Sequence, residues 1–114
     1  MDAEPVYKIC TAREWAQAVR QGRYTGSAVD AKDGFIHFST ARQAAETARR
    51  HFAGQSGLVL VTVDPALLQA DLTWEASRNG DLFPHLYGPL PTDTATGVRP
   101  LPLGDDGTPV LPEI

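Results

Sequence analysis

The sequence predicts a single, compact α+β domain. Its 114 residues match the usual size of one domain, and no linker is long enough to divide them. Segments with the two-residue period of strands are interspersed with two segments that have the period of helices. Seven of the nine prolines lie from Leu82 onward, which excludes long helices there. We expect a globular domain over residues 1–103 and a loose acidic tail over residues 104–114.

The first predicted elements are a strand and a helix. Residues 6–10 have the apolar character of a short strand. Thr11 begins a capping box, in which its side chain and that of a glutamate three residues later satisfy backbone amides at a helix start. A glycine follows residues 12–21 and provides a left-handed stop, so the helix is expected there, with Trp15 as its core anchor. Turn-forming residues predict a loop over residues 23–34.

A second capping box, beginning at Thr40, predicts a second helix that ends at Gly54. One apolar stripe runs along this helix, and its small residues would let the helix lie close to a sheet. Phe52 closes the stripe and is expected in the core. The stripe consists of Ala41, Ala44, Ala45, Ala48 and Phe52.

The second half of the chain is predicted to be mainly extended. Residues 58–64 are apolar on both faces and rich in β-branched side chains, as in a central strand covered on both sides. Residues 72–75 predict another strand, with Trp74 in the core. The prolines favour an extended segment over residues 83–90 and an edge strand over residues 96–101.

The stretch DGFIHFST, residues 33–40, places polar side chains in a strand-like segment. Side chains alternate across a strand, so Ile36 and Phe38 share one face while Phe35, His37 and Ser39 share the other. If the apolar pair faces the core, the histidine and the serine face a cleft or the solvent. A strand-borne histidine is also a common hydrogen-bonded structural residue, so both interpretations stay open.

Two other predicted strands carry residues of the same kind. Glu75 follows Trp74 in the segment LTWE, and its carboxylate is either an exposed strand residue or an acid or base held for chemistry. In the segment FPHLY, His85 and Tyr87 share one face. These side chains would converge with His37 if the strands are neighbours in one sheet.

Composition and charge exclude several classes of protein. The formal net charge of −4 argues against a general nucleic-acid-binding protein, which needs a basic face. No apolar run approaches the ~20 residues of a membrane span, and the first residues lack the pattern of a signal peptide. These features predict a cytoplasmic protein. Cys10 is the one cysteine, which excludes an internal disulfide, and its apolar setting predicts a packed thiol.

Familiar catalytic motifs are absent. Neither the P-loop pattern nor the Rossmann glycine pattern occurs, and Ser39 lacks the flanking glycines of a nucleophile elbow. His37, His85 and Glu75 have the donor types of a zinc site, but the sequence has no short ligand pair such as two histidines four residues apart. We therefore expect no metal.

The sequence resembles the family named domain of unknown function 952, a family of small bacterial proteins. The resemblance extends over nearly the whole chain in the same order. It is carried by VYKI at residues 6–9, GSAVDAKDGFIHFST at residues 26–40, TWEASRNGDLFPHLYGPL at residues 73–90 and the proline-rich end.

The resemblance implies a fold similar to that of ADP-ribosylating enzymes, in which two small sheets frame a cleft for NAD. We accordingly expect two small sheets with two helices. In that superfamily a strand ending in serine or threonine lines the nicotinamide side, and a later strand often carries a glutamate. Carried over to this chain, His37 and Ser39 match the middle motif and Glu75 is the candidate acid.

The first strand departs from the superfamily pattern, because VYKI has no histidine or arginine followed by glycine. The cation that holds the nucleotide would then be Lys8 or Arg78. His85 and Tyr87 complete the expected ligand-binding set. The resemblance makes NAD a candidate substrate and leaves any cofactor unknown.

Three functional hypotheses follow. The first is a small enzyme with ADP-ribosyl- or phosphotransferase-like activity on NAD, ADP-ribose or another phosphorylated ligand. The second is a non-catalytic module of the same fold that binds a small ligand or a protein partner. The third is that His37, Glu75 and His85 form a buried hydrogen-bond network that only stabilises the sheet.

Overall fold

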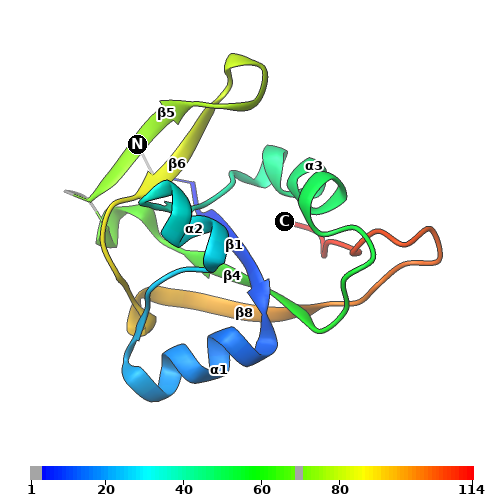
Figure 1. Cartoon of the computed structure of the whole chain (residues 1–114), viewed down its shortest axis with the longest axis horizontal. Helices are drawn as coiled ribbons and strands as arrows, with labels where there is room; N and C mark the ends of the chain where they lie inside the picture. The colour runs from blue at the N-terminus through cyan, green and yellow to red at the C-terminus, as the bar shows by residue number, and fades with distance from the viewer. Residues whose placement is uncertain (1–3, 69–70) are drawn as a thin grey trace.

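The computed structural model describes residues 4–68 and 71–114, without the side chain of Arg78. One sheet has three antiparallel strands in the order β1-β4-β8 (Figure 1). The two-sided apolar pattern of residues 58–64 and the prolines near residue 100 explain why β4 is central and β8 is an edge strand. The strands are β1 (Val6–Thr11), β4 (Leu58–Val63) and β8 (Ala95–Leu101).

The described residues form two further sheets, so the expectation of two sheets was wrong. A second antiparallel sheet has the order β3-β6-β5, with β6 in the centre, and a small third sheet pairs β2 with β7. In the third sheet, β2 lies within the predicted loop over residues 23–34, and β7 begins at the end of the segment predicted to be extended. These strands are β2 (Arg23–Tyr24), β3 (Ile36–His37), β5 (Leu72–Ala76), β6 (Leu82–Leu86) and β7 (Leu90–Pro91).

The two predicted helices are present and start with the predicted capping boxes. They are α1 (Ala12–Gln21) and α3 (Ala41–His51). A third helix, α2 (Ala28–Asp33), lies where a loop was expected, so the prediction of two helices was also wrong. Its cap is a further capping box, with Ser27 as N-cap and Asp30 in the position that glutamate usually takes. Within the described residues, three short 3₁₀ helices also occur, at Pro65–Leu67, Arg78–Gly80 and Thr92–Thr94.

Two apolar clusters involve opposite faces of the β1-β4-β8 sheet. Along β1, Val6 and Cys10 belong to the larger cluster, whereas Tyr7 and Ile9 belong to the smaller one. The larger cluster also contains Trp15 of α1, which confirms it as a core residue. This alternation gives β1 two buried faces, and its polar residue Lys8 points to the same side as the larger cluster.

The apolar stripe of α3 is only partly buried. Ala44 and Ala48 are fully buried, whereas Ala41 and Ala45 are exposed. Phe52 is partly buried and packs against the smaller cluster at the end of the helix. The stripe therefore covers the sheet along a narrower line than the periodicity indicated.

Trp74 was expected in the core, and this expectation was wrong. Its strand β5 is an edge strand, and the side chain is 45% exposed. Leu72 on the same face packs against the larger cluster, but the hairpin of β5 and β6 projects away from the body of the molecule beyond that point (Figure 1). Strand parity correctly placed Leu72 and Trp74 on one face of β5. The apolar cluster against which Leu72 packs does not extend to Trp74.

The last residues make defined contacts instead of the loose tail that was expected. Gly54 donates a backbone hydrogen bond to the carbonyl of Gly107, and Leu103 forms a bridge with Pro109. Leu111 packs against the smaller cluster, which lies beside α3. A division of the chain at residue 104 stays a prediction.

A backbone bridge joins the two three-stranded sheets. Tyr7 of β1 and Ser39, two residues after β3, exchange hydrogen bonds in both directions, each 2.8 Å long. Through this bridge the segment FIHFS leaves the β3-β6-β5 sheet and joins the β1 edge of the other sheet. The polar residues of β3 and β6 therefore lie where the sheets meet.

Candidate functional site

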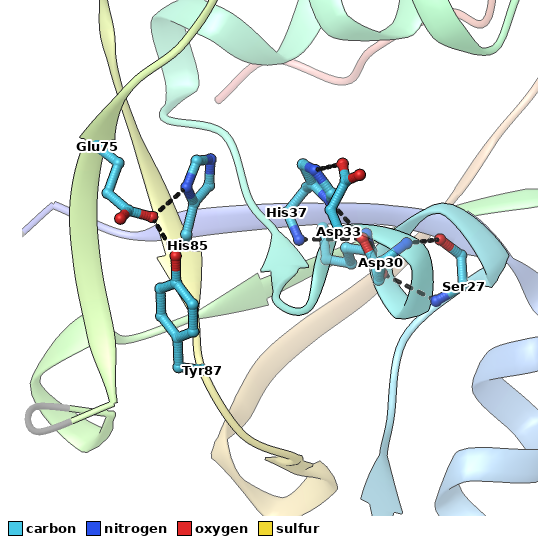
Figure 2. A network of polar contacts seen from close by, with 8 residues as sticks. Ser27, Asp30, Asp33, His37, Glu75, His85 and Tyr87 are labelled. Carbon is cyan, nitrogen blue, oxygen red and sulfur yellow. Dashed lines mark hydrogen bonds and ion pairs between the residues drawn. The ribbon is translucent and has the colours of Figure 1, made fainter.

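The candidate site is built on the β3-β6-β5 sheet. His37 of β3 lies directly opposite His85 of β6, and β5 pairs with the other edge of β6. The two imidazole rings are 5.6 Å apart and meet edge to face. Glu75 and Tyr87 join them on the same side of the sheet (Figure 2). The convergence expected for strand neighbours is thus found for these four residues.

Glu75 forms the first arm of the site. One of its carboxylate oxygens lies 2.7 Å from Nδ1 of His85 and accepts a 2.7 Å hydrogen bond from the Tyr87 hydroxyl. The hydrogen bond from Tyr87, followed by that from His85, lowers the pKa of the Glu75 carboxyl from its ordinary value. The same hydrogen bond raises the pKa of Tyr87, since the phenol donates to a carboxylate. Glu75 is therefore an ionised, oriented carboxylate at neutral pH.

Exposure differs sharply within this arm. The side chain of His85 is 6% exposed, whereas that of Glu75 is 38% exposed. The buried imidazole thus holds a carboxylate that still reaches the solvent. Glu75 can therefore contact a ligand while the hydrogen bond to His85 fixes the orientation of its carboxylate.

His37 forms the second arm, together with two carboxylates. Its Nδ1 lies 2.5 Å from Oδ1 of Asp30, and its Nε2 lies 2.9 Å from Oδ2 of Asp33. Each ring nitrogen therefore faces a carboxylate oxygen, so the imidazole is held from both sides. The side chain of His37 is 35% exposed, which leaves part of the ring open to a ligand.

Asp30 connects this arm to the interior. Its carboxylate accepts hydrogen bonds from the Lys8 ammonium at 2.8 Å, the Ser27 amide at 2.8 Å and the His37 amide at 3.1 Å. Burial alone would raise the pKa of Asp30, but the hydrogen bond from His37 and the charge of Lys8 outweigh it. The pKa is therefore held well below its ordinary value. Asp30 is 2% exposed, so it is a buried anion with several partners.

Phe35 lies among the rings of the site. Its ring stacks on His85 at 4.0 Å and contacts His37 at 4.5 Å and Tyr87 at 5.3 Å. The alternation in FIHF predicted Phe35 on the same face as His37, but Phe35 was not among the expected site residues. It gives the site an apolar surface next to the two histidines.

Sequence reasoning also missed Asp30 and Asp33. The serine-to-aspartate spacing of residues 27–30 was the available signal for Asp30, as a capping box. Asp33 precedes His37 by four residues but reaches it across the turn after α2. That turn contains Gly34 at φ +87°, a left-handed conformation that favours glycine.

Ser39 is separated from the other candidates by its surroundings. Its hydroxyl lies 3.0 Å from that of Thr47 on α3, and the residue is 5% exposed. Lys8 is likewise buried, with its ammonium against Asp30. The side chain of Arg78 lies outside the described residues. The structure thus brings together His37, Glu75, His85 and Tyr87, and ties Lys8 to His37 through Asp30.

Replacing Tyr87 by phenylalanine is expected to raise the pKa of Glu75 towards its ordinary value. The variant removes the hydrogen bond that contributes most to the lowered pKa while keeping a ring beside Phe35. The measurement is a pH titration of the Glu75 carboxyl carbon by NMR. Thr73→Val serves as control, because Thr73 makes none of these hydrogen bonds. An unchanged titration in Tyr87→Phe would refute the geometry of this arm.

The one cysteine, Cys10, is a buried free thiol. Burial raises the pKa of the Cys10 thiol to about 12, so the packed thiol is protonated at neutral pH. Within residues 4–68 and 71–114, no group of three or more His, Cys, Asp or Glu side chains has the arrangement of a metal site. Over the same residues no helix has the length and apolar character needed to cross a membrane.

Known structures closely resemble this fold. The crystal structure of protein CC0527 from Caulobacter crescentus has a TM-score of 0.90 at 51% sequence identity, over 92% of each chain. A double mutant of that protein gives a TM-score of 0.90 at 50% identity, over 92% of each chain. Its solution NMR structure gives 0.83 at 51% identity, over 92% of this chain and 90% of that one.

No curated protein is significantly similar to the chain. A family model, in contrast, matches residues 9–98, a range that contains both arms of the site. The protein therefore belongs to the family described as Protein of unknown function (DUF952).

Proposed function

We propose that the protein is a small enzyme that acts on NAD, ADP-ribose or a related phosphorylated ligand at the face formed by His37, Glu75, His85 and Tyr87. The observation that carries the proposal is the state of Glu75. Its carboxylate is oriented by two hydrogen bonds of 2.7 Å and is still partly exposed. An ionised carboxylate that is held in one direction and reaches the solvent can act on a bound ligand.

The chemistry that suits this carboxylate develops positive charge. Cleavage of the glycosidic bond at the nicotinamide ribose passes through an oxocarbenium-like transition state, which an oriented anion stabilises. Glu75 supplies that anion, since its lowered pKa keeps it ionised. Tyr87 and His85 fix its direction, and His37 contacts the ligand from the neighbouring strand.

Lys8 and Ser39, which were also expected in the site, have different support. The Lys8 ammonium is neutralised by Asp30, so Lys8 acts on the ligand only through the network to His37. Ser39 is covered by Thr47, which supports a role in joining the segment after β3 to α3. The proposal therefore rests on Glu75 and His37, and a catalytic role for Ser39 stays a prediction.

An ADP-ribosylation-like fold forms part of this proposal. Its support is the junction between two small sheets, where the strand that ends in Ser39 and Thr40 meets the first strand. A later strand, β5, carries the glutamate, as the resemblance implies. Both features agree with a fold in which two sheets flank the ligand.

Glu75→Gln is expected to keep ligand binding and to lose about 10²–10³-fold in turnover, because it removes the anion and preserves the shape. The measurements are thermal shift with NAD and ADP-ribose, and release of nicotinamide from NAD. Any ligand that binds only the folded protein raises its melting temperature by mass action, so the first readout assumes no reaction. Glu113→Gln, an exposed acid of the tail, is the matched control.

The outcomes separate the three hypotheses. Binding without turnover in the unaltered protein would favour the non-catalytic module, which the stacking of Phe35 on His85 also supports as a ligand platform. No shift with any phosphorylated ligand, together with a large loss of stability in both Glu75→Gln and His37→Ala, would favour a structural network. Equal turnover in Glu75→Gln and Glu113→Gln would contradict the proposed role of Glu75.

A further inference from the structure

A cavity of about 290 Å³ adjoins the candidate site. Asp30 and Phe35 line it, and both also belong to the site, so the cavity begins where the ring cluster ends. Its volume is close to the lower end of the range for small-molecule sites, about 300–1,000 Å³. Its walls come from the start of β2, from α2 and the turn after it, and from the segment after β6. They consist of Arg23, Thr25, Asp30, Ala31, Gly34, Phe35, Ile36, Leu86, Gly88 and Pro89.

We propose that this cavity binds a phosphate group, with Arg23 as its cation. Arg23 is the one basic residue in the cavity wall, and none of the ion pairs among the described residues involves it. The other charged wall residue, Asp30, is already compensated by Lys8 and His37. A guanidinium donates two parallel hydrogen bonds to a phosphate, which makes arginine well suited to this role.

The charges of the candidate site also indicate that an anionic group would bind in the cavity and not at the candidate site itself. Glu75 and Asp33, with side chains 38% and 41% exposed, place two carboxylates at the surface of the site. A phosphate there would be repelled, whereas the same carboxylates stabilise a cationic or electron-poor group. An extended ligand would therefore place its anionic end beside Arg23 and its reacting end beside Glu75, with Phe35 between them.

The cavity wall leaves room for close approach of the ligand to the backbone. Gly34 and Gly88 have φ of +87° and +137°; a Cβ on Gly34 would meet no atom within 4 Å, whereas one on Gly88 would lie 3.5 Å from a carboxylate oxygen of Asp71. No side-chain hydrogen bond among the described residues uses the hydroxyl of Thr25, so this group can donate to a phosphate oxygen. Arginine, a hydroxyl and side-chain-free backbone are the groups that phosphate sites commonly combine.

Phosphate binding by the cavity is inferred from this geometry alone. The further step, that the bound phosphate belongs to the ligand on which Glu75 acts, rests on the proposed function. The test is an NMR titration of the ¹⁵N-labelled protein with inorganic pyrophosphate, ADP-ribose and uncharged adenosine. Pyrophosphate and ADP-ribose are expected to shift the amide signals of Gly34 and Gly88 and the Nε signal of Arg23. Adenosine is expected to leave the Arg23 signal unchanged, because it carries no phosphate.

Variants of Arg23 test the cation directly. Arg23→Ala is expected to weaken pyrophosphate binding by about tenfold or more, or ~1.4 kcal/mol. Arg23→Lys is expected to lie in between, because it keeps the charge and loses the planar fork. Arg20→Ala removes the same charge from the exposed end of α1, outside the cavity wall, and is expected to bind as the unaltered protein does.

Three results would overturn the cavity as a phosphate site. They are no shift with pyrophosphate at millimolar concentration, shifts confined to other residues, and equal affinity in Arg23→Ala and Arg20→Ala. Glu75→Gln is expected to bind pyrophosphate normally, which separates this proposal from the proposed function. If the protein binds pyrophosphate but shows no turnover, only the proposed enzymatic activity is refuted. If it shows turnover but does not bind pyrophosphate, only the proposed phosphate site is refuted.

Discussion

Replacing Asp30 by alanine is expected to lower the free energy of unfolding by about 3–5 kcal/mol. Asp30 is 2% exposed, and its loss leaves the buried Lys8 ammonium without its ion-pair partner. The amides of Ser27 and His37 lose their acceptor as well. The measurement is urea denaturation at neutral pH. Asp33→Ala is the control, since Asp33 is 41% exposed and its loss should cost no more than about 1 kcal/mol.

Two further measurements separate the ion pair from general damage. The double variant Lys8→Met/Asp30→Ala should recover much of the loss, because it removes both buried charges together. Stability of the unaltered protein should fall as the pH drops below the ordinary aspartate value of about 4. The sign follows from the lowered pKa of Asp30: its contribution is present above the unfolded-state pKa and is lost as the pH falls towards the folded-state pKa. A loss of similar size in Asp33→Ala would contradict the central role of Asp30.

Phe38→Ala is expected to cost about 3–5 kcal/mol of folding free energy. Phe38 is 2% exposed within the larger apolar cluster, one residue beyond His37. Removing its ring leaves a cavity where the segment that carries His37 packs against the core. The measurement is again chemical denaturation, with the slope of the transition checked for a two-state process.

Trp74→Ala is the matched comparison for Phe38→Ala. The indole was predicted in the core from strand parity but is 45% exposed on an edge strand. Its loss should therefore cost well under half as much as that of Phe38, since buried area rather than ring size determines the penalty. Equal costs would show that the end of the β5–β6 hairpin is covered in solution.

Local signals were sufficient for several elements. Capping boxes at Thr11 and Thr40 fixed the starts of two helices, because the caps involve only residues three positions apart. Strand parity put Ile36 and Phe38 on one face, and the structure buries both of them. It also placed His37 on the face opposite to theirs, where His37 lies beside the other residues of the candidate site.

Strand parity gave wrong predictions where the result depended on which other element packs against the strand face. It grouped Ser39 with His37, but the chain changes sheets between them through the bridge to Tyr7, so Ser39 packs against α3. It placed Trp74 in the core, but the layer beneath the hairpin ends before that residue. Helix α2 was missed because aspartate replaces glutamate in its capping box and glycines flank it.

The sequence by itself determined where α1 and α3 start and that His37 lies on the strand face opposite Ile36 and Phe38, because capping and alternation depend on neighbours along the chain. Only the tertiary structure decided that His37 lies opposite His85, that Glu75 is bound by His85 and Tyr87, and that Asp30 takes up the charge of Lys8. These pairings join strands and helices far apart in the sequence. They depend on strand register and on the packing of α2, which no local pattern specifies.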